Sequence, residues 1–311
     1  EPLRFVDDFA TGSRAAVAGG VTTFGQMSFP EDDLPVATIR EAMTRDAAAA
    51  AAQSVADYVL HPGVFTATAD LLEAIPELAA AGHMSLKVVT LAFDHDPANL
   101  INAIKLAGDH GMLTIVHCED DAIIEFLTGD LIAHGHGHVS HYPDSRPEYT
   151  ETAAVERAIA ICEATGAPLC LAHLSAASAV ASARRARARG LPVFVETRPV
   201  YLHRTAAVYQ DADPGRFVGM PPQRSAGDVD ALWRGLADGS IHTVASDHAP
   251  WYLADKTDPA LDVRTCRKGI AEIETMVPML FDAGVRAGRI SLERLVAVTA
   301  TNAARLNGLY P

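Results

Sequence analysis

Four short apolar segments of this 311-residue chain each carry one polar side chain, and these four side chains constrain the fold more than any other feature. The segments have the composition of buried strands, and each is predicted to close with its polar residue: Lys87, His117, His173 or Asp247. A lone lysine in such a segment would be interpreted as a strand-end residue whose amine reaches water, because lysine is almost never buried without a partner. Three further strands that close with histidine or aspartate favour a different interpretation. We expect the four side chains to form one constellation.

Predicted strands and helices alternate along the whole chain. Seven segments have the apolar, β-branched composition of strands, and helical segments separate them. The strands begin at or near Val21, Asp57, Leu86, Leu113, Leu169, Val193 and Thr243. Strict alternation predicts a parallel sheet covered by helices, which makes the chain an α/β protein. Seven strands are one short of a (β/α)8 TIM barrel, so we expect such a barrel with its first strand upstream of Glu1.

Helices are predicted where apolar residues recur every three to four positions. We expect them over residues 5–18, 36–55, 71–81, 99–110, 123–131, 151–165, 176–189, 229–236, 273–283 and 292–306. The run His61-Pro62-Gly63 is predicted to end the strand that begins at Asp57. Catalytic residues of α/β barrels lie at the C-terminal ends of the strands. The four candidate residues all occupy that predicted position.

Charge and cysteine usage narrow the class of protein. The formal net charge is −14 and the pI is near 5.3, which argues against a nucleic-acid partner or an anionic membrane surface. No apolar segment approaches the roughly 20 residues that a membrane helix needs, and no signal peptide is recognisable. The four cysteines have no Cys-x-x-Cys spacing and suit a reducing compartment. We therefore expect a cytoplasmic protein that acts on a small molecule.

Histidine and carboxylate side chains from several strands suit a divalent metal such as zinc. A free lysine is a poor metal ligand, because its ammonium group has no acceptor. If carbon dioxide adds to the amine of Lys87, the product is a carbamate that can bridge two metals as a carboxylate does. This chemistry would place a lysine among the metal ligands.

Short motifs spread over the chain support one family. They are Gly19-Gly20-Val21-Thr22-Thr23, Leu86-Lys87-Val88, Val116-His117-Cys118-Glu119, Ser145-Arg146-Pro147, Ala172-His173-Leu174-Ser175, Glu196-Thr197-Arg198-Pro199, Pro221-Pro222, Ala231-Leu232-Trp233, Ser246-Asp247-His248-Ala249-Pro250 and Thr301-Asn302-Ala303-Ala304-Arg305-Leu306. In this order and spacing the chain resembles the amidohydrolase superfamily, in its hydantoinase and dihydropyrimidinase branch. Dihydroorotases and allantoinases are more distant relatives of that branch.

The resemblance implies a metal-dependent hydrolase. Two divalent metal ions, zinc first among them, would be bridged by carbamylated Lys87 and by a hydroxide. His117 and His173 would bind one metal, and Asp247 would bind the other. The bridging hydroxide would attack the C–N bond of a cyclic amide such as a hydantoin or dihydropyrimidine, and Asp247 would act as base and then as acid. The family also implies a homo-oligomer, either a dimer or a tetramer.

Two parts of the family pattern are not in this sequence. The family has a His-x-His pair at the end of its first strand, and the present sequence begins after that point. It also has a small β-sandwich domain built from segments that flank the barrel. We therefore expect residues 1–311 to be the barrel domain, with the first strand and the sandwich segments missing.

The predicted substrate pocket departs from the family. Residues 90–93 lack the tyrosine that hydantoinases commonly carry after the lysine. The predicted substrate-binding residues are Met220, Lys268, Gly269, Arg267 and Arg198. The three cations in this set would favour an anionic substrate, because charge-assisted hydrogen bonds are the stronger ones. The alternative is that they pair with acidic residues such as Asp262 or Glu272.

Two other functions stay open at this point. The first is a related enzyme with the same metals and another pocket: an allantoinase, a dihydroorotase or a cyclic-imide hydrolase. The second is a non-catalytic scaffold protein that keeps the barrel without its metals. The His-rich segment 134–141 is interpreted as a surface loop, and the arginines of segment 184–189 as one solvated helix face.

Overall fold

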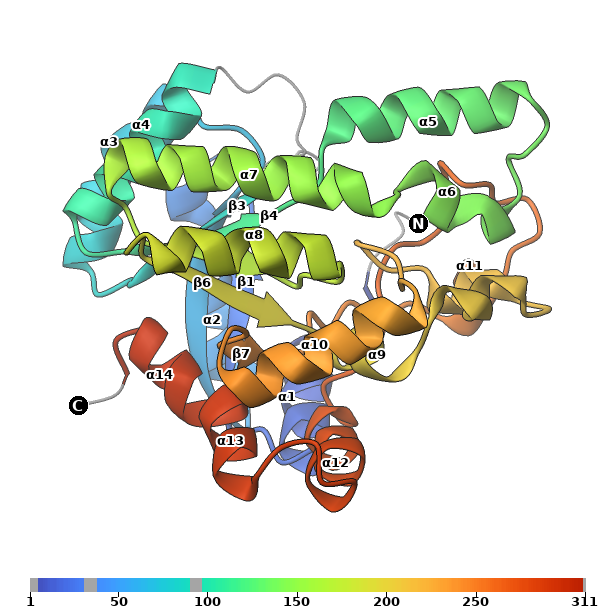
Figure 1. Ribbon diagram of the computed structural model, residues 1–311. Coiled ribbons are helices and arrows are strands. Elements are labelled where there is room, and N and C mark those ends of the chain that lie inside the picture. The colour runs from blue at the N-terminus through green and yellow to red at the C-terminus, as the bar shows by residue number, and fades with distance from the viewer. Residues whose placement is uncertain (1–4, 31–37, 90–96, 310–311) are drawn as a thin grey trace.

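A curled sheet of seven parallel strands forms the centre of the protein in the computed structural model, which describes residues 5–30, 38–89 and 97–309 (Figure 1). Each strand pairs with its neighbour in the chain, so the spatial order is the order in the sequence. The strands are β1 (Thr23–Ser28), β2 (Asp57–Val64), β3 (Ser85–Val89), β4 (Leu113–His117), β5 (Leu169–Ala172), β6 (Val193–Thr197) and β7 (Thr243–Val244). The predicted barrel-like α/β fold is confirmed. The segment 90–93, where the family tyrosine was sought, lies outside the described residues.

Helices cover the outer face of this sheet (Figure 1). They are α1 (Phe9–Ala18), α2 (Ile39–Gln53), α3 (Ala69–Ala80), α4 (Pro97–Asp109), α5 (Asp121–Ala133), α6 (Tyr142–Ser145), α7 (Glu148–Thr165), α8 (Ala177–Ala188), α9 (Pro199–His203), α10 (Ala226–Asp238), α11 (Leu253–Lys256), α12 (Met276–Leu280), α13 (Leu292–Val296) and α14 (Asn302–Leu306). Capping boxes begin three of them, with Asp8, Thr38 and Ser225 as the N-cap residues. Asp8 explains why the first helix starts at Phe9 and not at residue 5.

Two predictions about element boundaries were wrong. The strand that begins at Asp57 does not end at His61, because His61 and Pro62 pair with β1 and Gly63 pairs with Lys87 of β3. The segments predicted as two continuous helices near the C-terminus are interrupted by π-helical turns at Phe281–Arg286 and Ala297–Thr301. Such turns add a residue to the helical repeat, which a periodicity of 3.6 does not reveal.

Alternate residues of the strands face two different cores. Leu86, Val88 and Val116 belong to the outer core between sheet and helices. Ile115 and Cys170 belong to a smaller core on the inner face of the sheet. Because successive side chains of a strand point to opposite faces, Lys87 and His117 must lie on the inner face as well. The strand alternation thus places Lys87 and His117 inside the curled sheet.

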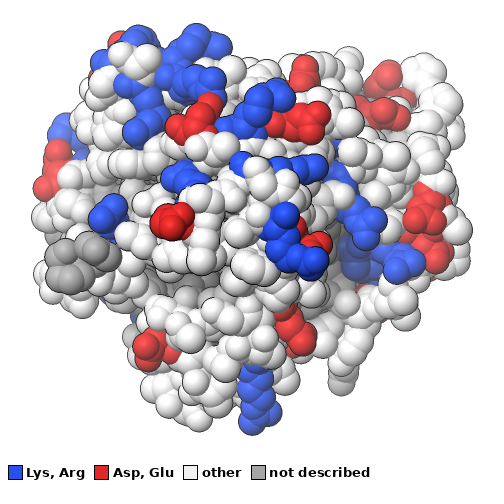
Figure 2. Space-filling view, turned by 60° about the horizontal axis from the view of Figure 1, so that its bottom comes forward, with Lys and Arg blue, Asp and Glu red and all other residues white. Residues whose placement is uncertain are grey.

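The surface carries both signs of charge, and Figure 2 shows basic and acidic side chains interspersed on one face of the molecule. On α8, Arg184 binds Asp238 and Arg185 binds Glu156, with N–O distances of 2.5 and 2.8 Å. These exposed pairs confirm the interpretation of the arginine series as a solvated helix face. Of the helices in the described ranges, none has the length and apolar composition to cross a membrane.

Candidate active site

The four predicted metal ligands come from four strands, at different depths. His117 is the last residue of β4, His173 directly follows β5, and Asp247 lies three residues beyond β7. The prediction that Lys87 closes its strand is wrong, because Lys87 lies in the middle of β3. The register pairs Lys87 with Ile115 and Val89 with His117, so Lys87 starts about 6.6 Å lower in the sheet than His117. The four-carbon stem of lysine is long enough to compensate for most of that difference.

Burial sets the protonation state of Lys87. Lys87 is 7% exposed. Burial lowers the pKa of its amine, and the charges of Asp247 and Glu196 raise this pKa by less. The charge of Lys87 also lowers the pKa of His117 and of His173, so the amine is in electrostatic range of both imidazoles. A lowered pKa increases the fraction of neutral amine, which is the nucleophilic form. This is the form that can add to carbon dioxide.

The two histidines face each other across the inner side of the sheet. His117 Nδ1 lies 2.8 Å from His173 Nε2, and the ring centroids are 4.5 Å apart. Burial is the main cause that lowers the pKa of both imidazoles, so both are neutral at neutral pH. Neutral imidazole is the form that binds metal ions. The facing pair therefore presents two nitrogens to one point in the site.

A buried carboxylate orients His117. Glu119 Oε2 lies 3.1 Å from His117 Nε2, and Arg146 Nη1 donates to the same oxygen at 2.8 Å. Burial would raise the pKa of Glu119, but the charge of Arg146 and the bond to His117 outweigh it and lower this pKa to about 2. An ionised Glu119 accepts a hydrogen bond from the Nε2–H of His117. This tautomer leaves Nδ1 as the acceptor that faces the site. Carboxylates commonly orient metal-binding histidines in this way.

Sequence reasoning assigned no role to Glu119 or Arg146, although both lie in motifs that carried the resemblance. The signal was an acidic residue two positions after a strand-end histidine, since that spacing leaves the side chain buried beside the imidazole. A charged residue in such a place requires a partner. Only the fold shows that this partner is Arg146, which lies 27 residues further along the chain.

Asp247 is held by a buried arginine. Arg198 follows β6, is 1% exposed at its side chain, and donates from Nη1 to Asp247 Oδ2 at 2.7 Å. Its Nε and Nη2 donate to Glu272 Oε2 at 2.9 and 2.6 Å, and Glu272 Oε1 accepts the N–H of Val200. The alternative pairing of Arg198 with Glu272 is therefore present in the structure. The guanidinium of Arg198 is already shared by two carboxylates.

Two predicted ligands have an unusual backbone conformation. His173 has φ of 44° and Asp247 has φ of 43°, and among the described residues these are the non-glycine residues with positive φ. Side chains beyond Cα make this left-handed region uncommon, and such residues concentrate at functional sites. Local strain thus coincides with the predicted ligands.

Four of the five predicted substrate-binding residues lie in two segments, and the fifth is Arg198. Met220 belongs to segment 218–221, whose Gly219 lies next to the Arg198 guanidinium. Gly269 belongs to segment 267–269 and has φ of 139°, and a Cβ there would lie 2.4 Å from the carbonyl oxygen of Ala249. That close approach explains why glycine stands at this position. We call segments 218–221 and 267–269 the rim segments.

The other two predicted cations lie in the second rim segment. Lys268 Nζ donates to the carbonyl of Arg264 at 3.0 Å, and burial lowers the pKa of this amine. The charges of Cys266, Arg146 and Glu119 also act on the pKa of Lys268. The Arg267 guanidinium lies 5.9 Å from the centre of the Trp251 ring. Neither Arg267 nor Lys268 forms an ion pair with a carboxylate in the part of the chain that the structure describes.

The donor set fits a divalent metal once Lys87 is modified. The described residues contain no group of three or more His, Cys, Asp or Glu side chains that could hold a metal by themselves. Asp247 therefore does not form such a group with His117 and His173. Within the described residues, His173 Nδ1 is buried and has no hydrogen-bond partner, although the facing Nε2 has one. A carbamate at Lys87 would complete a set of oxygen and nitrogen donors.

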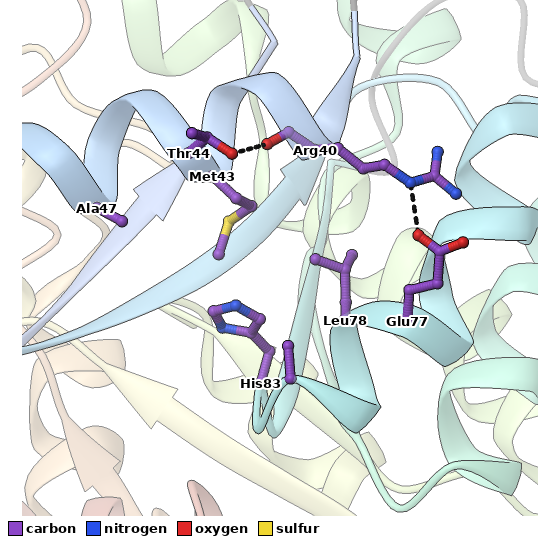
Figure 3. A pocket seen from close by; sticks show the side chains of 8 residues that line it. Arg40, Met43, Thr44, Ala47, Glu77, Leu78 and His83 are labelled. Atoms are coloured by element: carbon purple, nitrogen blue, oxygen red, sulfur yellow. Dashed lines mark hydrogen bonds and ion pairs between the residues drawn. The ribbon is translucent and has the colours of Figure 1, made fainter.

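Two other features lie away from this site. The histidines of segment 134–141 are exposed or half-buried and bond to nearby groups, such as His141 to Asp144 at 2.9 Å. A hollow of about 320 Å³ lies outside the sheet between α2 and α3 (Figure 3). Its lining residues are Arg40, Met43, Thr44, Ala47, Glu77, Leu78, Ala81 and His83. It contains none of the predicted site residues, and Arg40 binds Glu77 at its edge at 2.7 Å.

Comparisons with known proteins agree with this geometry. The sequence profile described as "Amidohydrolase family" matches residues 6–311. A D-phenylhydantoinase of Escherichia coli O1:K1 is 35% identical over 312 residues, which cover 99% of this chain and 67% of the relative. The chain therefore spans about two thirds of the length of this relative.

Solved structures are similar over the same extent. The dihydropyrimidinase from Brevibacillus agri superposes with a TM-score of 0.93 at 31% identity, covering 99% of this chain and 68% of that one. The L-hydantoinase (dihydropyrimidinase) from Arthrobacter aurescens has a TM-score of 0.87 at 30% identity, covering 98% of this chain and 67% of that one.

Proposed function

Because the chain belongs to the amidohydrolase family, we propose that it is a metal-dependent hydrolase that opens the C–N bond of a cyclic amide, such as a hydantoin or dihydropyrimidine ring. The observation that carries the proposal is the pair of facing imidazole nitrogens, 2.8 Å apart, beside the buried amine of Lys87. The two histidines lie at the C-terminal ends of parallel strands, where barrel enzymes place their chemistry, and Lys87 extends from the middle of β3. Residues 1–311 would form the barrel domain of the enzyme.

We propose two divalent metal ions, most readily zinc, as the cofactors. His117 and His173 would hold one of them, Asp247 would hold the other, and a carbamate at Lys87 would bind both. In forming the carbamate, the neutral Nζ adds to the carbon of carbon dioxide and releases one proton. Burial favours this step because it lowers the pKa of the amine. The bound metals would lower the pKa of water and polarise the amide carbonyl.

The protein side chains would move the proton and hold the ring. Asp247 would take a proton from the attacking water and deliver it to the departing ring nitrogen. Arg198 binds Asp247 Oδ2, so the other carboxylate oxygen, Oδ1, would be the one to move the proton. Met220 and Gly269, in the two rim segments, would hold the ring beside Asp247. Ring opening would give an open-chain carbamoyl or amide acid.

The cations of the rim segments bear on the charge of the substrate. Lys268 and Arg267 have no carboxylate partner among the described residues, whereas Arg198 is shared by two carboxylates. We therefore propose that Lys268 and Arg267 favour a substrate that carries a carboxylate or another anion, while Arg198 acts mainly through Asp247. Allantoinase, dihydroorotase and cyclic-imide hydrolase activities are not favoured for this chain. The similar proteins described above are named hydantoinases and dihydropyrimidinases. A non-catalytic scaffold is not favoured either.

A homo-oligomer, dimer or tetramer, is proposed on the surface of α5. This helix exposes Phe126 at 72% and Ile132 at 38%, and Tyr149 of the adjoining α7 is exposed at 52%. Large exposed apolar side chains of this kind are candidates for contacts with a second copy of the chain. We also propose a cytoplasmic location, which is supported by four cysteines that are all free and buried.

The test is a turnover screen combined with metal analysis of the full-length protein. Hydantoin, dihydrouracil, allantoin, dihydroorotate and succinimide would be offered before and after treatment with a chelator. We expect hydrolysis of hydantoin or dihydrouracil, loss of that activity in the chelator, and recovery with zinc. A protein that holds metal but opens none of these rings would refute the proposed reaction. A protein that binds no divalent metal would support the scaffold alternative.

A further inference from the structure

Lys256 is a buried lysine that forms no ion pair in the described residues. It is the last residue of α11 and is 7% exposed. A lysine is almost never buried to this degree without a partner. The partners here are three backbone carbonyl oxygens: those of Val218 and Arg267, each 2.9 Å from Nζ, and that of Gly269. An ammonium group has three N–H donors, so each donor has one acceptor.

The three carbonyls belong to the two rim segments. Val218 lies in segment 218–221, and Arg267 and Gly269 lie in segment 267–269. The N–H of Gly269 also donates to the Val218 carbonyl, at 3.1 Å. Lys256 therefore lies at the contact between two segments that are about fifty residues apart in the chain.

Other buried side chains bind carbonyls of only one rim segment each. Tyr142 donates to Gly219 at 3.0 Å, and Tyr201 donates to Pro221 at 2.6 Å. Trp251 Nε1 donates to the carbonyl of Lys268 at 3.1 Å. These bonds orient each segment by itself. The Lys256 ammonium is the side-chain donor in the described residues that bonds to both.

We propose that Lys256 is a positioning residue that fixes the distance between the two rim segments and thereby the width of the substrate pocket. That the rim segments line a substrate pocket rests on the proposed function. In that function Met220, Arg267, Lys268 and Gly269 are the residues that contact the substrate. Lys256 does not touch the reacting atoms. It acts through the backbone that carries those residues.

The chemistry explains why a cation is needed at this point. A neutral side chain of similar length, such as methionine, would leave three buried carbonyl oxygens without this donor. Each unsatisfied buried acceptor is costly, so the segments would separate to admit water. Glutamine offers two N–H donors and should preserve part of the contact. The expected order of pocket width is therefore wild type, Lys256→Gln, then Lys256→Met.

Hydrogen exchange tests the proposal without any substrate. Amide exchange would be measured by mass spectrometry in wild type, Lys256→Met and a matched control, Lys105→Met, whose lysine is exposed on α4 and bound to Asp109. We expect exchange at least about tenfold faster in peptides covering both rim segments of Lys256→Met, with β3 to β5 unchanged. The control should match wild type. Unchanged exchange, or faster exchange throughout the barrel, would overturn the proposal.

Wild-type protein gives a second test if the variants do not fold. The two rim segments should then open with the same free energy, because one ammonium joins them. Two clearly different opening free energies in wild type would contradict the proposal.

Kinetics distinguish positioning from a general loss of structure. Lys256→Met should raise KM at least about tenfold with little change in kcat and with full metal content, and Lys256→Gln should restore part of the KM. Equal losses in kcat and metal content would assign Lys256 a merely structural role. If wild type hydrolyses none of the cyclic amides, the proposed function fails, whereas the exchange results still decide the role of Lys256 in joining the segments.

Discussion

Arg198 Nη1 lies 2.7 Å from Asp247 Oδ2, so the predicted catalytic carboxylate is held by a guanidinium that is itself almost completely buried. The same guanidinium binds Glu272 through two further donors. The three side chains form one charged unit in which the two carboxylates depend on a single cation. Changing one member should affect both the stability of the barrel and the geometry of Asp247.

The first prediction concerns this unit. Arg198→Gln should lower the free energy of unfolding by about 3–5 kcal/mol, because it leaves the buried carboxylate of Glu272 without its cation. Glu272→Gln should lower it by less, because Arg198 keeps its bond to Asp247. The double variant should lose less than the sum of the two single losses. Denaturant titration of all four proteins measures this coupling. Arg185→Gln, at an exposed pair, should change the unfolding free energy by less than about 1 kcal/mol. Additive losses would show that the two residues act independently.

The second prediction concerns the carbamate. Lys87→Ala should abolish turnover and metal binding, because alanine cannot form the bridging group. Short-chain carboxylic acids should restore part of both, since they supply two oxygens in the space of the lost side chain. The measurement is turnover and metal content with and without the added acid. Near-normal activity of Lys87→Ala in the absence of acid would disprove the carbamate. The control is Lys105→Ala on α4, whose turnover and metal content should match wild type with and without the added acid.

The third prediction concerns substrate charge. Lys268→Ala and Arg267→Ala should each lower kcat/KM for a carboxylate-bearing cyclic amide by roughly tenfold or more, because each removes a charge-assisted hydrogen bond. Turnover of the neutral analogue should stay near the wild-type value. The test compares both substrates in wild type and in both variants. Equal effects on the two substrates would assign these residues to the structure of the rim and not to recognition.

The fourth prediction concerns alkaline pH. Burial lowers the pKa of Lys256 from 10.5 to about 8, while Cys266 and Arg198 also act on its charge. Between these pH values the unfolded chain binds more protons at Lys256 than the folded one, so the contribution of this group to the unfolding free energy rises with pH. One pKa unit corresponds to about 1.4 kcal/mol, which gives a rise on the order of 3 kcal/mol.

The comparison that isolates this effect is wild type against Lys256→Met. The unfolding free energy of wild type minus that of Lys256→Met should be constant below pH 8. It should rise up to pH 10.5 and then level off. Cys266 and Arg198 are present in both proteins, so their own titration largely cancels. A difference that stays constant, or that falls with rising pH, would show that the pKa of Lys256 is not lowered in the folded state.

Local patterns in the sequence determined the order of the elements and the location of His117 and His173. An apolar segment of strand length indicates a buried strand without reference to the rest of the chain. The alternation of strands and helices then implies a parallel sheet, whose C-terminal ends meet at one edge. The predicted barrel followed from these local signals, as did the expectation that the four polar residues lie together. Motif spacing added the resemblance to the amidohydrolases.

Tertiary structure decided which side chains touch. The contact of His117 with His173 joins positions 56 residues apart, and that of Arg198 with Glu272 joins positions 74 residues apart. The depth of Lys87 depends on strand register, which the apolar pattern of β3 does not specify. The three carbonyl partners of Lys256 belong to the backbone, and every residue type except proline offers the same backbone groups. Side-chain identity therefore predicted where charged groups lie along the chain, but only the packing of distant segments determined their partners.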